Sequence, residues 1–485
     1  MRNLRKITAV KMSDIELSRL FRQTRKACKS DDEEFKRASL KIFNRLVDLN
    51  KNRQWAEAVG EIIPRIFARD INTGYDLFHD EKVMQQLWDL YSTATPLIVE
   101  NLDIQKWSGQ KASKCKIIVI TSVFWDDIAP SRAVCDFARS LDPEIFETVI
   151  ICTNQFFTHK RRIGAEVPGE NNTLLGHQMK QIGIPVISLE PCESNTHLAE
   201  LLIEKCQELE PDIIVSNASP FGFPDACLAS SGIAGAFFDM HQGFPMYADN
   251  IDAICHFVPE TKETQLSLWE RQGGKVLSYD FGIPVSDKVP EKHDNGDKVY
   301  LITVSNHLTD RLSEEFCNLV SEVMLEYQNV HYTLVGKSTE EILKAKFPSK
   351  LHSRIECVGA INDENQIAGW LLCSDIYLNE FPVGGGRALL ESMAMQLPII
   401  AMRCGERHVE NIATSFVGDE AILEYSSEKY RECLIKLIED KEYRHKTGQK
   451  LRKRLEDVYD IRITVKKLGE EIYELYQKKC LRQIN

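Results

Sequence analysis

The feature that most constrains this chain is an alternation of short apolar runs with helix-like stretches. Runs rich in β-branched residues, such as 116–124 (KIIVITSVF) and 148–154 (TVIICTN), are followed by segments in which apolar residues recur at three and four positions. This alternation predicts a parallel β-sheet with helices on both of its faces. The sequence therefore predicts an α/β fold.

The alternation occurs twice, on either side of a polar segment. Residues 284–298 (PVSDKVPEKHDNGDK) are rich in Pro, Asp, Asn and Lys and nearly lack apolar side chains, which is typical of an interdomain linker. Two doubly wound domains joined in this way place ligands in the cleft between the carboxyl ends of their strands. We therefore expect an all-α N-terminal region at 1–110, a Rossmann-like domain on the acceptor side of such a cleft at 111–284, and a nucleotide-binding Rossmann-like domain with C-terminal helices at 298–485.

Composition limits the class of protein. At 485 residues, with 43% hydrophobic and 27% charged residues, the chain is expected to form two or three globular domains. The formal net charge of −12 argues against a general nucleic-acid binder. The fourteen cysteines are scattered singly, with no C-x-x-C pair and no secretory signal, which favours reduced thiols in a cytoplasmic protein.

The N-terminal 30 residues form a basic patch, with nine Lys or Arg against two acids. Such a patch is typically a solvated helical face, and the alternative is a contact with an acidic acceptor, a partner protein or an anionic membrane surface. No apolar run reaches the roughly 18–20 residues that span a bilayer. Any membrane association is therefore predicted to be peripheral.

A glycine-rich turn, NEFPVGGGRALLESMAMQLPII, carries the strongest chemical signal. Gly384, Gly385 and Gly386 follow a predicted strand and precede a predicted helix, so the backbone can approach a ligand closely. The free N–H groups and the positive dipole end of that helix can bind phosphate. Arg387 can add a charge-assisted contact, and Glu391 is placed to accept hydrogen bonds from ribose hydroxyls. On spacing alone, a turn that simply packs against a neighbour is an equal alternative.

The longer stretch LNEFPVGGGRALLESMAMQLPIIAMRCGERHVENIATSFVGDEAILEYSSEKYRECLIKLIEDKEYRHKTGQKLRKRL resembles the catalytic region of the O-GlcNAc transferase group and of the related bacterial cytoplasmic protein N-glycosyltransferases. Shared features are an acid on the glycine-led helix, a proline before the next strand, a G-E after that strand, and a Tyr-bearing helix with L..D..Y. The resemblance extends more loosely over 115–480. It implies the GT-B fold, in which two Rossmann-like domains face one cleft, and transfer of a sugar from a nucleotide sugar.

The chain also departs from that group. The paired acids at a spacing of eight, typical of the large retaining GT-B group, are absent, because Val383 stands eight residues before Glu391, although Glu380 lies near. This absence favours the inverting, O-GlcNAc-transferase-like group. The histidine and threonines that this group places on its phosphate turn are replaced by Gly386 and Arg387, so the pyrophosphate contacts must differ.

The resemblance points to further donor-binding residues after the first strand of the second domain. A basic residue there holds the donor diphosphate in the resembled group, and Arg311 in TVSNHLTDRLSEEF is the matching candidate, with Asn306 in the same stretch. A guanidinium suits bidentate phosphate binding, but Arg311 can instead pair with Glu314 or Glu315. Lys337, directly after TLVG, is a weaker alternative.

Candidate catalytic residues lie in the first domain. Asp126 and Asp127 follow its first strand, where a carboxylate could take a proton from an acceptor hydroxyl or could simply form a turn. His241 ends a later strand, and the GFP…IDA run after it is similar to GHP…IDY in the resembled family. That similarity implies contact with the donor phosphate or the acceptor, with general base as the sharper alternative and a structural histidine as the plain one.

These observations predict a glycosyltransferase that moves GlcNAc or glucose from a UDP-sugar to a protein side chain or a glycan. The donor is implied by the resemblance alone. No D-x-D cluster lies near a glycine turn, which agrees with a reaction that needs no metal and no cofactor beyond the nucleotide sugar. The alternatives are a retaining GT-B enzyme of glycan or capsule synthesis in which Glu380 coordinates the sugar, a sugar-nucleotide epimerase, and a catalytically inactive GT-B partner subunit.

Overall fold

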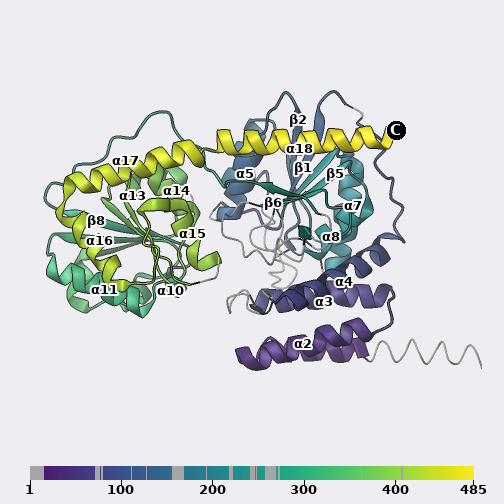
Figure 1. The fold of residues 1–485 in the computed structure, drawn as a ribbon, viewed down its shortest axis with the longest axis horizontal. Helices are drawn as coiled ribbons and strands as arrows, with labels where there is room; N and C mark the ends of the chain where they lie inside the picture. The colour runs from purple at the N-terminus through teal and green to yellow at the C-terminus, as the bar shows by residue number, and fades with distance from the viewer. Residues whose placement is uncertain are drawn as a thin grey trace, which may run out of the picture.

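The computed structural model describes residues 16–484 apart from 71–76, 78–79, 111, 127, 156–168, 193, 218–221, 241–245, 247, 257–268, 271–273, 362 and 406–407. Two of the predicted catalytic residues, Asp127 and His241, lie outside the described residues. The chain forms a group of N-terminal helices and two parallel sheets covered by helices (Figure 1). The α/β prediction is therefore confirmed.

The N-terminal region is helical, as predicted. It contains α2 (Asp32–Asp48), α3 (Arg53–Asp70) and α4 (Glu81–Val99). Asp31 and Asp80 begin α2 and α4 by accepting hydrogen bonds from backbone N–H groups of the first turn. The apolar faces of these helices share one core with two helices of the first sheet and with one face of that sheet. This region is thus packed onto the first sheet rather than separate from it (Figure 1).

The first sheet has seven parallel strands in the order β3-β2-β1-β4-β5-β6-β7. The strands are β1 (Cys115–Thr121), β2 (Phe146–Cys152), β3 (Val186–Ser188), β4 (Ile213–Asn217), β5 (Ala236–Asp239), β6 (Ala253–His256) and β7 (Val276–Ser278). The helices between them are α5 (Ala129–Ser140), α6 (Leu174–Gln181), α7 (Asn195–Leu209) and α8 (Phe223–Ser231). We call these strands and helices the first unit. The apolar runs identified in the sequence included neither β3 nor β7, because three residues are too few to show a pattern.

The second sheet has five parallel strands in the order β10-β9-β8-β11-β12. The strands are β8 (Val299–Val304), β9 (Val330–Val335), β10 (Ile355–Gly359), β11 (Ile376–Leu378) and β12 (Ile399–Ile400). Its helices are α10 (Leu308–Arg311), α11 (Glu314–Glu326), α12 (Glu340–Lys344), α13 (Glu364–Leu372), α14 (Arg387–Ala394), α15 (His408–Val417), α16 (Ser427–Glu439) and α17 (Lys441–Val458). We call this the second unit. Its strand order reverses between β8 and β11, where doubly wound sheets bind ligands.

The last helix, α18 (Ile461–Ile484), returns to the first unit, and Figure 1 shows it lying along the side of that sheet. The hydroxyl of Tyr476 donates to Asp212 Oδ1 at 3.1 Å, and Lys479 Nζ lies 2.8 Å from Asp252 Oδ2. The ring of Tyr473 packs edge-on against Phe146. The two units are therefore joined by two chain crossings, the linker before β8 and the passage into α18.

None of the fourteen cysteines forms a disulfide, and eight of them are buried. Burial raises the pKa of several of these thiols, for example that of Cys152 to about 12, so they are protonated at neutral pH. Across the part of the chain that the structure describes, no helix combines the length and the apolar character needed to cross a membrane.

Candidate functional site

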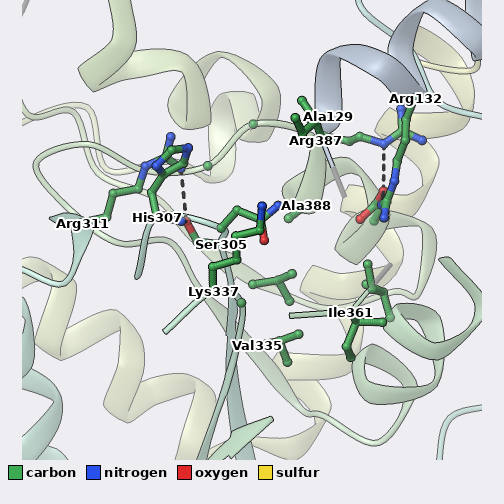
Figure 2. A pocket seen from close by; sticks show the side chains of 18 of the residues that line it. Ala129, Arg132, Ser305, His307, Arg311, Val335, Lys337, Ile361, Arg387 and Ala388 are labelled. Atoms are coloured by element: carbon green, nitrogen blue, oxygen red, sulfur yellow. Dashed lines mark hydrogen bonds and ion pairs between the residues drawn. The ribbon is translucent and has the colours of Figure 1, made fainter. Parts of the chain in front are cut away.

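A cleft of about 450 Å³ lies between the two units (Figure 2). The second unit contributes the carboxyl ends of β8 and β9 and the start of α14, and the first unit contributes the start of α5. The cleft therefore lies at the strand-order reversal of the second sheet. Its lining consists of residues 128–130, Arg132, residues 304–307, Arg311, residues 335–337, Ile361, Ile367, residues 385–388 and Glu391.

Arg311 lies at one end of the cleft and faces a buried carboxylate. Its Nη1 atom is 3.6 Å from Glu380 Oε1 and donates to Ser305 Oγ at 3.4 Å (Figure 2). Glu380 has no exposed side-chain surface, and within the described ranges neither of its oxygens accepts a hydrogen bond of good geometry. Burial raises the pKa of Glu380, and the charge of Arg311 opposes that rise. Arg311 thus pairs with Glu380. The alternative, a pair with Glu314 or Glu315, is not what the structure shows.

The loops after β8 and β9 complete this end of the cleft. Asn306 and His307 follow β8, and Lys337 follows β9. Burial and the charge of Arg311 lower the pKa of His307, so its imidazole is neutral at neutral pH. The two loops are joined at Gly336, whose φ is +152° and where a Cβ atom would lie 1.7 Å from the carbonyl oxygen of Ser305.

Neither His307 nor Gly336 was predicted from the sequence as a site residue. The signal for Gly336 was present, because a glycine directly after a strand marks a close approach of two backbones. His307 offered no such signal, since its position at the cleft depends on how the loop after β8 folds.

The three glycines of the turn differ in how closely their neighbours pack. A Cβ atom at Gly384 would lie 2.1 Å from Asn379 Nδ2, so this glycine is required by packing. A Cβ atom at Gly385 would have nothing closer than Arg311 Nη1 at 3.5 Å. Gly386 is the N-cap residue of α14, and no side chain caps that helix start. Gly385 and Gly386 line the cleft, next to the start of α14, which no side chain caps.

Arg387 pairs with carboxylates in the structure, whereas the sequence predicted that it would contact phosphate. Its Nη1 atom donates to Asp136 Oδ2 at 2.7 Å, its Nε to Glu391 Oε1 at 2.9 Å and its Nη2 to Glu364 Oε1 at 3.1 Å. The residue is only 8% exposed. Its charge is therefore compensated by carboxylates of α5, α13 and α14, although its side chain still lines the cleft.

Glu391 lies at the same end of the cleft as Arg387. Its Oε1 atom also lies 3.7 Å from Arg132 Nη1, and Figure 2 shows the side chains of Arg132 and Arg387 extending toward each other. Burial raises the pKa of Glu391, and the two guanidinium groups oppose that rise. The carboxylate predicted to meet a ribose thus lies in the cleft wall, held on one side by arginines from both units.

Asp126 has a structural role, which was the alternative to its predicted catalytic one. Its two carboxylate oxygens accept hydrogen bonds from the backbone N–H groups of Leu174 and Leu175, at 3.0 and 2.9 Å. It therefore stabilises the first turn of α6. Asp127 and His241 lie outside the described residues, so their predicted roles stay predictions. No group of three or more metal-ligating side chains is found within the described parts of the chain.

Comparisons with known proteins agree with this geometry. Residues 301–440 match the profile of the family described as Glycosyl transferases group 1. A point mutant of the O-GlcNAc transferase of Thermobaculum terrenum has a similar structure, with a TM-score of 0.57, 12% identity, and coverage of 96% of this chain and 98% of that one. A glycosyltransferase from Rickettsia africae gives a TM-score of 0.53 at 14% identity, over 75% of this chain and 99% of its own. No curated protein matches the sequence.

Proposed function

We propose that this chain, whose residues 301–440 match the group 1 glycosyltransferase family and whose two units have the GT-B fold, is a glycosyltransferase that uses a UDP-sugar, UDP-GlcNAc or UDP-glucose, as its donor. The observation that carries the proposal is the cleft itself, whose lining combines Arg311, Lys337 and the uncapped start of α14 with the carboxylate of Glu391. A nucleoside diphosphate sugar has the complementary pattern, with two anionic phosphates beside a ribose that offers hydroxyls.

The donor diphosphate is proposed to bind between Arg311, Lys337 and the start of α14. The backbone N–H groups after Gly385 carry the positive end of the helix dipole, and Arg311 supplies a guanidinium from the end of α10. As the bond to the sugar breaks, negative charge grows on the leaving diphosphate, and these groups stabilise it. We propose that they do so without a metal ion.

The ribose is proposed to donate hydrogen bonds from its hydroxyls to Glu391. This residue lies one turn into α14, beyond the phosphate-binding start of the helix, which is the order in which a nucleotide presents phosphate and ribose. The burial of Glu391 supports the assignment, because a carboxylate shielded from water forms stronger hydrogen bonds.

The acceptor, a protein side chain or a glycan, is proposed to approach from the first unit. Its hydroxyl or amide must lose a proton, and Asp127 and His241 remain the proposed bases for that step. Asp126 is a weaker candidate for the base than its sequence position suggested, because both of its oxygens already accept backbone hydrogen bonds.

An inactive GT-B partner subunit is a second candidate function. The observation that favours it is the compensation of Arg387, which removes one of the cations expected to bind phosphate. A retaining enzyme that uses Glu380 on the sugar is less favoured, because Glu380 is buried behind Arg311 and is not part of the cleft lining.

The test is the melting temperature of the purified protein with UDP, GDP, CDP or ADP, each with and without Mg²⁺. A ligand that binds only the folded state at about 100 times its Kd stabilises that state by about 2.7 kcal/mol. We expect UDP alone to raise the melting temperature, equally with and without Mg²⁺, and Glu391→Ala to lose the rise. Glu322→Gln, an exposed acid of α11, is the matched control and should keep it. No rise with any nucleotide would favour the partner-subunit function.

A further inference from the structure

The arginine and carboxylate cluster at the Glu391 end of the cleft joins the two units. Asp136 comes from α5 of the first unit, whereas Glu364, Arg387 and Glu391 come from α13 and α14 of the second. Asp136 is 2% exposed, and its other oxygen accepts a hydrogen bond from Arg139. A buried ion pair of this kind has little water to replace a missing partner, so its geometry is more strictly fixed than that of a surface pair.

Arg387 connects Asp136 to Glu391 through a rigid group. A guanidinium is planar, and its five N–H bonds point in fixed directions. Asp136 at 2.7 Å and Glu364 at 3.1 Å hold its two Nη atoms, and this fixes the direction of the Nε–H bond that Glu391 Oε1 accepts at 2.9 Å. A change at Asp136 therefore rotates or releases the group that orients Glu391.

The two oxygens of Glu391 have different surroundings. Oε1 accepts a hydrogen bond from Arg387 Nε and lies 3.7 Å from Arg132 Nη1. Oε2 accepts no hydrogen bond from any residue that the structure describes. Because Glu391 lines the cleft, the oxygen left over is the one available to a ligand hydroxyl. The hydrogen bond from Arg387 thus determines which oxygen of Glu391 is available to a ligand in the cleft.

We propose that Asp136 is a positioning residue for the donor ribose: through Arg387, it orients the Glu391 carboxylate from across the cleft, so that ribose recognition by the second unit depends on the first. The inference rests on the proposed function, since it requires that Glu391 meets ribose hydroxyls. Its consequence is that a residue of the acceptor-side unit, which touches no part of the donor, sets the affinity for the nucleoside.

The experiment measures the Kd of UDP and of 2′,3′-dideoxy-UDP by isothermal titration calorimetry on the full chain. Asp136→Leu removes the carboxylate and keeps a branched side chain, although a bulkier one, and Asp136→Asn keeps the shape and one acceptor in case the leucine variant folds poorly. We expect Asp136→Leu to raise the Kd of UDP roughly ten-fold and to change that of the dideoxy nucleotide by less than about two-fold, since members of one ion-pair network are coupled. Asp136→Asn should show the same pattern, with a smaller rise in the Kd of UDP. Glu322→Gln, which changes an exposed acid of α11 outside this network, is the control and should leave both Kd values unchanged.

Several results would overturn the inference. If both nucleotides lose affinity equally, Asp136 supports the cleft as a whole rather than the ribose contact. If Glu391→Ala removes the preference for UDP over the dideoxy nucleotide but both Asp136 variants keep it, the donor site stands and only the positioning role fails. If wild-type protein binds neither nucleotide, or if Glu391→Ala leaves the preference intact, the proposed ribose contact itself fails and the inference fails with it.

Discussion

Replacing Arg311 by glutamine should destabilise the second unit even without any ligand. The variant leaves the fully buried Glu380 without its cation, whose Nη1 atom lies 3.6 Å from Glu380 Oε1. At that distance, an effective dielectric constant of about 20 gives an attraction of about 4.6 kcal/mol. The measured loss should be smaller, about 2–3 kcal/mol, because Arg311 is 26% exposed and because the carboxyl group can take up a proton instead.

The loss should depend on pH in a defined direction. Burial raises the pKa of Glu380 above its ordinary value of 4.5 in the folded protein, and removing Arg311 raises it further. A carboxyl whose pKa is raised by folding lowers stability as the pH rises from the unfolded value through the folded one. The deficit of Arg311→Gln relative to wild type should therefore grow as the pH rises above the ordinary value of 4.5 and shrink below it.

The assay is urea denaturation of wild type, Arg311→Gln, Glu380→Gln and the double variant, with hydrogen exchange of β11 as the local probe. The double variant should be more stable than Arg311→Gln, because no uncompensated carboxylate remains. Strictly additive effects of the two substitutions, or a deficit that does not change with pH, would refute the reasoning, since the two side chains would then not be coupled.

Two further substitutions test the packing around the cleft and the docking of the last helix. Gly384→Ala should destabilise the protein by roughly 1–3 kcal/mol, because its Cβ atom would lie 2.1 Å from Asn379 Nδ2, whereas Gly385→Ala has open space and should melt like wild type. Equal melting temperatures for the two alanine variants would contradict this difference. Tyr476→Phe should lower the free energy of unfolding by about 0.5–1.5 kcal/mol, because it removes the hydrogen bond to Asp212 that holds α18 on the first unit. A neutral result in urea denaturation would mean that this bond adds nothing to the docking of α18.

Much of the fold could be predicted from the chain alone. The two series of apolar runs became two parallel sheets, and the polar segment 284–298 lies between β7 and β8. The glycine turn lies between β11 and α14, as expected. These features depend on residues close together in the sequence, where periodicity and turn chemistry act directly.

The partners of the charged residues were less predictable. Sequence spacing suggested that Arg311 pairs with Glu314 or Glu315. In the structure it faces Glu380, which lies in the loop after β11. Sequence position suggested Asp126 as a contact for the acceptor, yet that carboxylate stabilises the start of α6. In both cases the partner is brought close by chain folding, which a single sequence does not report.

The sequence by itself determined the two doubly wound units, the glycine-led helix at the cleft and the acid one turn into that helix. Only the tertiary structure decided what Arg387 does, because its partner Asp136 lies 251 residues away and meets it only when the two units come together. The physical reason is that backbone pattern follows from local periodicity, whereas the state of a charge depends on every group that packs around it, near or far in the chain.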